Sequence, residues 1–237
     1  MDRSLDYQYL FLLPEGREVR VAIAIEPHTM ILSSLPDPPW PVWTGLAFHQ
    51  CPNCPLAGDA LPACPAALAL LPVVRSFGGL ASHDPVQVEI ITPERRISQG
   101  TTAQRAIGSL AGLLLAVSGC PRTAFFRPMA RFHLPLASEA ETTYRAASMY
   151  LMAQYFRRRD GQEPDHDFAG LAALYQEIQA VNAALAKRLR AATETDSSVN
   201  AIILLDMYAK AMPYVIRDAM EELRYLFASY CENDSCP

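Results

Sequence analysis

The sequence predicts an α+β fold with a small N-terminal antiparallel β-layer, a proline-rich cysteine loop and a C-terminal bundle of about five helices. Two changes of pattern indicate this. Apolar residues alternate over residues 6–33, whereas from residue 101 onwards they recur at helical spacing. Between these regions, residues 34–72 hold nine prolines, which we expect to exclude long helices and central strands. We therefore expect residues 1–100 to form the β-layer with the cysteine segment, and residues 101–237 to form the helical bundle, within one compact unit.

The β-layer begins with a hairpin over residues 6–33. Its first half alternates aromatic residues with polar ones, and its second half alternates valine and isoleucine with polar or small residues. Pro14, Glu15 and Gly16 between the halves have turn chemistry. Residues 86–90 alternate in the same way, so we expect a further strand beside the hairpin.

Capping signals mark the starts and ends of the first helices. Two capping boxes open apolar periodic segments: Thr101 with Gln104, and Ser138 with Glu141. They predict helices over 101–117 and 138–158. Gly119 and Gly161 stand where helices commonly end. Apolar residues occur on two sides of the 138–158 segment, so we expect that helix to be central.

The rest of the chain predicts three more helices. One covers about residues 167–191, with a long apolar stripe. Asp196 is a candidate N-cap for the next, which we expect Pro213 to interrupt or end. A last amphipathic segment carries Ile216 to Tyr230.

Composition excludes several classes of function. The formal net charge is −5, so no overall positive field favours nucleic acid or an anionic membrane. The longest apolar run, over residues 106–117, is shorter than the roughly 20 residues that a bilayer requires. The first residues do not resemble an export signal. We expect a cytoplasmic protein that binds neither nucleic acid nor membrane.

The cysteines carry the strongest chemical signal. Six cysteines in a reducing compartment favour metal ligation or thiol chemistry over disulfides. The four that lie before the helical bundle's last helices are each followed by proline, as is the terminal Cys236, and proline keeps such loops out of helical conformation. These candidate metal ligands are Cys51, Cys54, Cys64 and Cys120. His49 and His133 are weaker candidates as further ligands or as hydrogen-bond partners of ligands. Cys231 and Cys236, near the C-terminus, are not expected to take part.

Two metal groups fit this spacing. The Cys-x2-Cys pair suits zinc, but ribbon-type zinc sites use a second close pair, and Cys64 stands alone. Iron–sulfur clusters accept a Cys-x2-Cys pair followed by isolated cysteines, and a Cys-Pro step is familiar in such runs. The pattern thus favours an iron–sulfur cluster slightly over zinc, and both remain open.

Two other functions fit the same residues. In the first, the protein is a non-enzymatic binding or assembly module, and the metal only staples the prolyl segment; such a module could be a homo-oligomer. In the second, Cys51-Pro52-Asn53-Cys54 is a redox-active dithiol. The dithiol mechanism needs a helix directly after the motif, and the prolines that follow argue against one. Whether the protein is an enzyme stays open at this point.

A loop after residue 120 combines arginines with apolar residues. Arg122, Arg127 and Arg131 could form forks for a small anionic ligand, such as a carboxylate or a phosphate. The alternative is that they tie the loop to acidic residues of the bundle, and we favour it. Because Cys120 belongs to this loop, the arginines could also meet the metal centre and form an adjacent substrate pocket.

Three longer motifs carry a resemblance to a known group of sequences. They are HQCPNCPL at 49–56, SGCP at 118–121 and RPMARFHLP at 127–135. Together they resemble an uncharacterised bacterial protein family, and the similarity extends over nearly the whole chain. The resemblance implies no particular activity, so no catalytic residue follows from it.

Overall fold

The computed structural model describes residues 4–58, 62–192 and 197–231. The chain divides into two compact units, which we describe separately. Unit 1 comprises Met1–Leu136 and Glu177–Met207, and unit 2 comprises Ala137–Gln176 and Tyr208–Pro237. Both units draw on the two longest helices, so the boundaries of the compact units do not follow the order of the chain. The expected cap at Asp196 and the expectation for Cys236 concern residues outside the described ranges.

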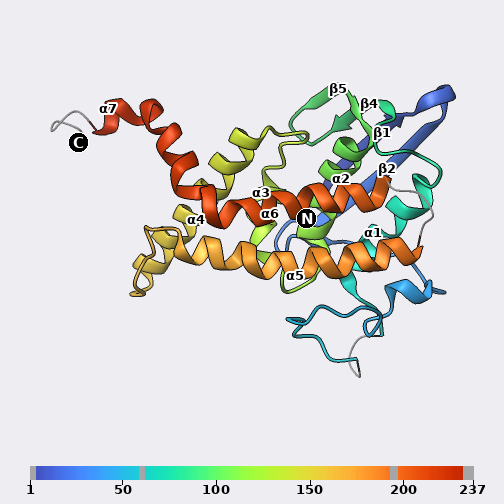
Figure 1. Ribbon diagram of the computed structural model, residues 1–237, viewed down its shortest axis with the longest axis horizontal. Coiled ribbons are helices and arrows are strands. Elements are labelled where there is room, and N and C mark those ends of the chain that lie inside the picture. Colours follow the sequence, from blue (N-terminus) through green and yellow to red (C-terminus); the bar gives the residue numbers. More distant parts are fainter. Residues whose placement is uncertain (1–3, 59–61, 193–196, 232–237) are drawn as a thin grey trace. The chain divides into compact units, whose positions relative to one another are not determined.

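Unit 1 is built on a five-stranded antiparallel sheet in the order β3-β2-β1-β4-β5 (Figure 1). Its strands are β1 (Leu5–Leu12), β2 (Glu18–Glu26), β3 (Ile31–Leu32), β4 (Pro85–Ile91) and β5 (Arg96–Thr102). The expected hairpin is confirmed as β1 and β2, joined by the turn η1 (Pro14–Gly16). Glu15 and Gly16 there have φ of 66° and 77°. The expected additional strand is β4, which pairs with β1.

One face of the sheet is buried against helices. The alternate residues Tyr7, Tyr9 and Phe11 of β1 are almost fully buried, as the period of two requires. They share one hydrophobic core with α1 (Pro65–Ser76) and α2 (Ala103–Val117). The sheet and these two helices therefore form the α+β core that the pattern predicted.

The helix α1 contradicts the expectation that prolines keep residues 34–72 free of long helices. It contains 12 residues, nearly all of them apolar and most of them buried. Pro65 stands in its first turn, where the missing N–H costs nothing, and Pro72 lies inside it. Burial of an apolar segment thus outweighs the loss of one helical hydrogen bond at Pro72.

The first capping box is also a wrong prediction. Thr101 lies in β5, where it pairs with Val86 of β4. The strand β5 therefore continues to the point where α2 begins. Thr102 occupies the N-cap position, and its side chain makes no cap hydrogen bond. The N–H of Gln104 donates instead to the carbonyl of Ser82, at 3.0 Å. Gly119, by contrast, ends the helical region with φ of 85°, as predicted.

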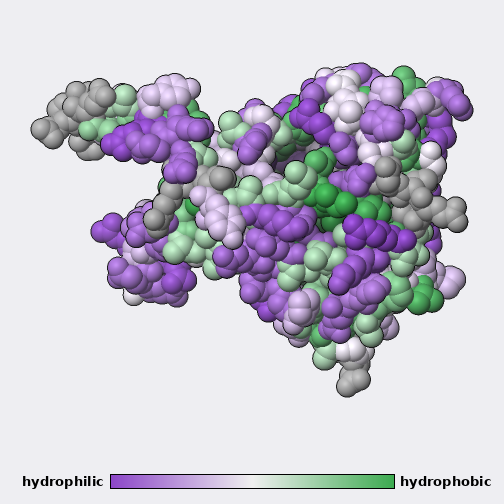
Figure 2. Space-filling model, viewed as in Figure 1, coloured by the Kyte–Doolittle hydropathy of each residue, from purple (hydrophilic) through white to green (hydrophobic). Residues whose placement is uncertain are grey.

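Parts of α5 (Ala169–Ala192) and α6 (Ser197–Glu222) complete unit 1. The apolar stripe of α5 joins the core through Val181, Leu185 and Leu189. The first part of α6 leaves several apolar side chains only partly buried, and Figure 2 shows hydrophobic residues gathered at the surface there. Unit 1 also holds the short elements η2 (Val42–Thr44), η3 (Ala124–Phe126) and α3 (Arg127–Arg131).

Unit 2 contains α4 (Glu139–Arg159), the start of α5, the end of α6, η4 (Arg224–Phe227) and α7 (Ala228–Cys231). The second capping box is confirmed, because Ser138 and Glu141 exchange both hydrogen bonds at the start of α4. The expectation that this helix is central is wrong: Met152, Tyr155 and Phe156 are more than half exposed. Its buried side is instead the narrow stripe of Thr143, Ala146, Ala147, Tyr150 and Gln154.

The helix α6 corrects the expectation for Pro213. It runs from Ser197 to Glu222 as one helix, with Pro213 inside it. The neighbouring Met212 and Ile216 are almost fully buried, so packing stabilises the helix across the proline. The predicted fourth and fifth helices are accordingly one long helix followed by the short η4 and α7. In the described part of the chain, no helix has the length and apolarity needed to cross a membrane.

Candidate metal centre

The four candidate cysteines come from three segments of unit 1. Cys51 and Cys54 close a turn in which the Cys54 N–H donates to the Cys51 carbonyl, at 3.0 Å. Cys64 is the N-cap residue of α1, and its N–H donates to the carbonyl of Thr44, at 2.8 Å. Cys120 follows the end of α2, directly after Gly119. All four thiols are free, and each is at least partly buried.

The thiols lie close enough to influence one another electrostatically. The pKa of Cys51 is raised to about 11, mainly by burial and to a smaller extent by the charges of Cys64, Cys120 and Cys54. Burial also raises the pKa of Cys120, and Cys64 adds to that shift. The three segments therefore bring all four sulfur atoms into one region of unit 1.

The side chains do not form a ready coordination shell in this conformation. Among the residues that the structure describes, no three His, Cys, Asp or Glu side chains form a group that could hold a metal ion. Binding by these cysteines would consequently require the side chains to draw together around the ion. Cys51 and Cys54 are the partly exposed members, so they have the most freedom to do so.

Backbone N–H groups of the loop after α2 affect the Cys120 thiol. Hydrogen bonding by the N–H groups of Arg122 and Thr123 lowers the pKa of Cys120, against the larger effect of burial. The Thr123 hydroxyl also donates to the carbonyls of Leu115 and Cys120, which fixes the loop after α2. Donors aimed at a sulfur stabilise its thiolate, and such bonds tune metal–thiolate centres.

Arg188 of α5 adds a buried positive charge to this region. Its side chain donates to the carbonyls of Trp43, Gly45 and Leu46, at 2.8, 2.7 and 3.0 Å. The residue is only 1% exposed, and no carboxylate of the described residues pairs with it. Its charge lowers the pKa of Cys51, so the guanidinium lies within electrostatic range of that thiol. A buried cation without an acidic partner favours negative charge nearby.

Arg122 ties the two cysteine loops together. Its Nε donates to the carbonyl of Asn53 at 2.6 Å, and its Nη1 lies 3.2 Å from Oε2 of Glu177. The Asn53 side chain donates to the same carboxylate and to the Glu177 carbonyl, at 2.6 and 3.0 Å. This clamp joins the loop that holds Cys51 and Cys54 to the loop that follows Cys120.

The other two arginines of that loop have neighbours different from those of Arg122. Arg131 lies 3.5 Å from a carboxylate oxygen of Glu94, and its guanidinium stacks over Phe132. Arg127 is half-buried, and its Nε has no hydrogen-bond partner. Arg122 and Arg131 thus make contacts of the kind expected of loop clamps, and Arg127 is the one of the three without a described acidic partner.

The two candidate histidines have other neighbours. Nε2 of His133 lies 2.5 Å from the hydroxyl of Tyr9, and burial raises the pKa of Tyr9 well above its usual value. Tyr9 therefore stays protonated, and its hydroxyl shares hydrogen bonds with His133 and Ser109. His49 is exposed, has φ of 45°, and packs its ring edge-on against Phe48. The structure places neither ring among the groups that shift the pKa of Cys51 or Cys120.

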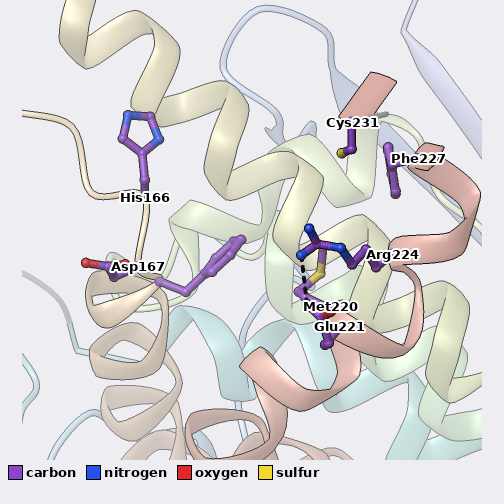
Figure 3. Close-up of a pocket in the computed structure, with 8 residues that line it drawn as sticks. His166, Asp167, Met220, Glu221, Arg224, Phe227 and Cys231 are labelled. Atoms are coloured by element: carbon purple, nitrogen blue, oxygen red, sulfur yellow. Dashed lines mark hydrogen bonds and ion pairs between the residues drawn. The ribbon is translucent and has the colours of Figure 1, made fainter. Parts of the chain in front are cut away.

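Unit 2 has a separate hollow of about 350 Å³ at the end of α6 (Figure 3). Its lining combines acidic, basic, aromatic and sulfur-bearing side chains: His166, Asp167, Phe168, Met220, Glu221, Arg224, Phe227 and Cys231. Figure 3 shows the Arg224 guanidinium joined to Glu221, at 3.4 Å. Because its positive charge is already paired and the hollow is open, we find no chemistry here comparable to that of the cysteines.

These features define an α+β protein with four reduced thiols gathered beside a buried arginine. The family model described as "Domain of unknown function (DUF6901)" matches residues 5–228, so the chain belongs to the DUF6901 family. This agrees with the resemblance to an uncharacterised family that the three motifs suggested. No curated protein and no solved structure gave a significant match.

Proposed function

We propose that this protein binds a metal centre through the thiolates of Cys51, Cys54, Cys64 and Cys120. The observation that carries the proposal is the convergence of three separate segments, which place all four cysteines in or against one core and bring the other three within electrostatic range of Cys51. Cysteines that merely fill a core need no such convergence. The free thiols also fit a reducing compartment, and we therefore propose a cytoplasmic location.

The surroundings of the sulfurs support a negatively charged metal–thiolate group. Four thiolates around a divalent ion, or around an iron–sulfur cluster, leave an excess of negative charge. Arg188 supplies a buried positive charge, and the N–H groups of Arg122 and Thr123 donate towards Cys120. Cys64 lies at the N-terminus of α1, where the helix dipole favours an anion such as a thiolate. The donor set suits zinc and an iron–sulfur cluster alike.

Within this proposal, we favour a structural role for the metal. The centre would join the prolyl loop, the start of α1 and the end of α2. Arg122 and Arg131 already contact acidic residues, which leaves only Arg127 as a candidate for an anionic substrate. The metal would then act as a staple of a binding or assembly module, whereas a catalytic centre would require an open position for a substrate.

The dithiol function is the weaker alternative. A nucleophilic cysteine needs a lowered pKa, and burial raises the pKa of Cys51 to about 11. Cys54 is followed by an irregular segment, whereas thiol oxidoreductases place a helix after the motif. Protein that is isolated without metal and carries a reactive Cys51 thiolate would restore this alternative.

Elemental analysis of anaerobically purified full-length protein tests the proposal. We expect one zinc ion, or the iron and sulfide of one cluster, per chain, and an absorption spectrum separates the two because zinc is colourless. The Cys51→Ser and Cys54→Ser double variant should lose the metal. Cys231→Ser is the matched control, because this exposed thiol lies outside the group and its loss should change nothing. Metal-free wild-type protein, or a double variant that keeps its metal, would overturn the proposal.

A further inference from the structure

The helix α4 of unit 2 has a second stripe on its exposed side, with mostly apolar residues in the middle and a charged residue at each end. Its buried side is formed mainly by small residues, and the exposed stripe repeats with alternating steps of three and four residues. The members of this heptad stripe are Glu141, Tyr144, Ser148, Leu151, Tyr155 and Arg158. Tyr144, Leu151 and Tyr155 are 45%, 37% and 54% exposed, and Met152 and Phe156 beside them are also more than half exposed. Such spacing is typical of a helix that packs along another helix.

Charges are distributed unevenly along α4. Glu139 and Glu141 lie in its first turn, and Arg157, Arg158 and Arg159 lie in its last turn. No carboxylate of the described residues forms an ion pair with these three arginines. A helix that is acidic at one end and basic at the other is complementary to an antiparallel copy of itself.

The heptad stripe also matches itself in register when it is reversed. With a two-fold axis midway between residues 149 and 150, Glu141 faces Arg158 of the second copy. In the same register Tyr144 faces Tyr155, and the small Ser148 faces Leu151, so a large side chain meets a small one at the centre. Because the contact has two-fold symmetry, each of these residue pairs occurs twice in the interface.

We propose that α4 is a homodimer interface, in which two copies of α4 pack antiparallel along the heptad stripe. The occupant is a second copy of this chain, because both the charge pattern and the register are self-complementary. Aromatic pairs supply the apolar contact, and an ion pair between Glu141 and Arg158 closes each end. The interface lies in unit 2 and does not depend on the metal centre of unit 1.

The test is the molar mass of the full-length chain, measured by light scattering over a dilution series. We expect a dimer for the wild type, and a dissociation constant raised about tenfold or more for Arg158→Glu, because that change places two carboxylates opposite each other. Arg157→Glu is the matched control: it makes the same charge change one residue away from the heptad stripe, and it should dissociate much less. Circular dichroism checks that both variants stay helical.

A mixing experiment separates loss of the interface from loss of the fold. Glu141→Arg and Arg158→Glu chains should each dimerise poorly alone and form a heterodimer when mixed, because opposite charges then meet at both ends. A wild type that is monomeric throughout the series, or a dimer equally sensitive to Arg157→Glu and Arg158→Glu, would overturn the proposal. Failure of the mixture to recover dimer would contradict the antiparallel register.

Discussion

Gly170, near the start of α5, is required because other groups approach it closely. A Cβ at this position would overlap the Tyr150 hydroxyl and would lie 3.3 Å from a carboxylate oxygen of Asp165. That carboxylate accepts hydrogen bonds from the Tyr150 hydroxyl and the Gly170 N–H, both at 2.7 Å. The three residues form a tight junction between α4 and the start of α5 within unit 2.

We predict that Gly170→Ala destabilises the protein by about 1–3 kcal/mol, because the junction must open to admit the methyl group. Urea unfolding measures the change in the free energy of unfolding. Tyr150→Phe removes the hydroxyl that the new methyl would meet. The double variant should therefore lose less stability than the sum of the two single changes. Strict additivity would show that this close approach is not what excludes alanine.

Arg188 makes the strongest single side-chain connection between α5 and the turn before the cysteine loop. Arg188→Met would leave the carbonyls of Trp43, Gly45 and Leu46 without this donor, and each buried acceptor so left costs about 1–3 kcal/mol. We predict a loss of several kcal/mol in thermal or urea unfolding. The neighbouring Lys187 is exposed, so Lys187→Met is the matched control and should stay within about 0.5 kcal/mol. Equal effects of the two changes would contradict the buried role of Arg188.

At the scale of the element, the capping box of α4 allows a direct test. Ser138 accepts a hydrogen bond from the Glu141 N–H, and the Glu141 carboxylate accepts one from the Ser138 N–H. We predict that Ser138→Ala lowers the free energy of unfolding by about 1 kcal/mol, because an N–H of the first turn loses its partner. Ser148→Ala makes the same change within the exposed surface of α4 and should cost no stability. Protein in which the two variants are equally stable would show that the cap is unimportant.

The elements that the sequence predicts correctly are those with a clear period or cap. The alternation of apolar and polar residues predicts the hairpin and β4, and the capping box predicts the start of α4. Apart from the expected central position of α4, the wrong predictions rest on proline and on threonine. Pro72 and Pro213 lie inside helices whose burial offsets the missing hydrogen bond, and Thr101 belongs to an edge strand. The secondary structure at such positions depends on burial in the tertiary structure, which local sequence propensity does not include.

The candidate site was visible in the sequence only in part. Each of the four candidate thiols belongs to a Cys-Pro step, and the structure brings the four into one region. The contribution of Arg188 was missed, although its place three residues after the core residue Leu185 puts it on the buried side of α5. The link between Asn53 and Glu177 joins positions 124 residues apart, and neither residue has a pattern that reveals the other.

At the scale of the whole molecule, the four candidate metal-binding cysteines lie entirely within unit 1. The proposed centre would connect the loop at residues 51–54, the start of α1 and the end of α2, which otherwise meet through side-chain contacts such as those of Arg122 and Arg188. The structured core of unit 2 has no residue in that group: its buried residues include Tyr150, Leu171 and Ile216. Removal of a metal staple should therefore act on one unit of the chain.

Hydrogen exchange of the metal-loaded and chelated full-length protein tests this division. We predict that chelation speeds exchange in residues 41–58 and 118–127, because the loops lose their common anchor, while the buried stripe of α4 keeps its protection. The Cys51→Ser and Cys54→Ser double variant, which cannot hold the metal, should show the chelated pattern without any chelator. Exchange that stays unchanged in the cysteine loops would contradict the staple and favour a removable catalytic centre. Faster exchange spread equally over both units would instead mean that the metal governs the stability of the whole chain.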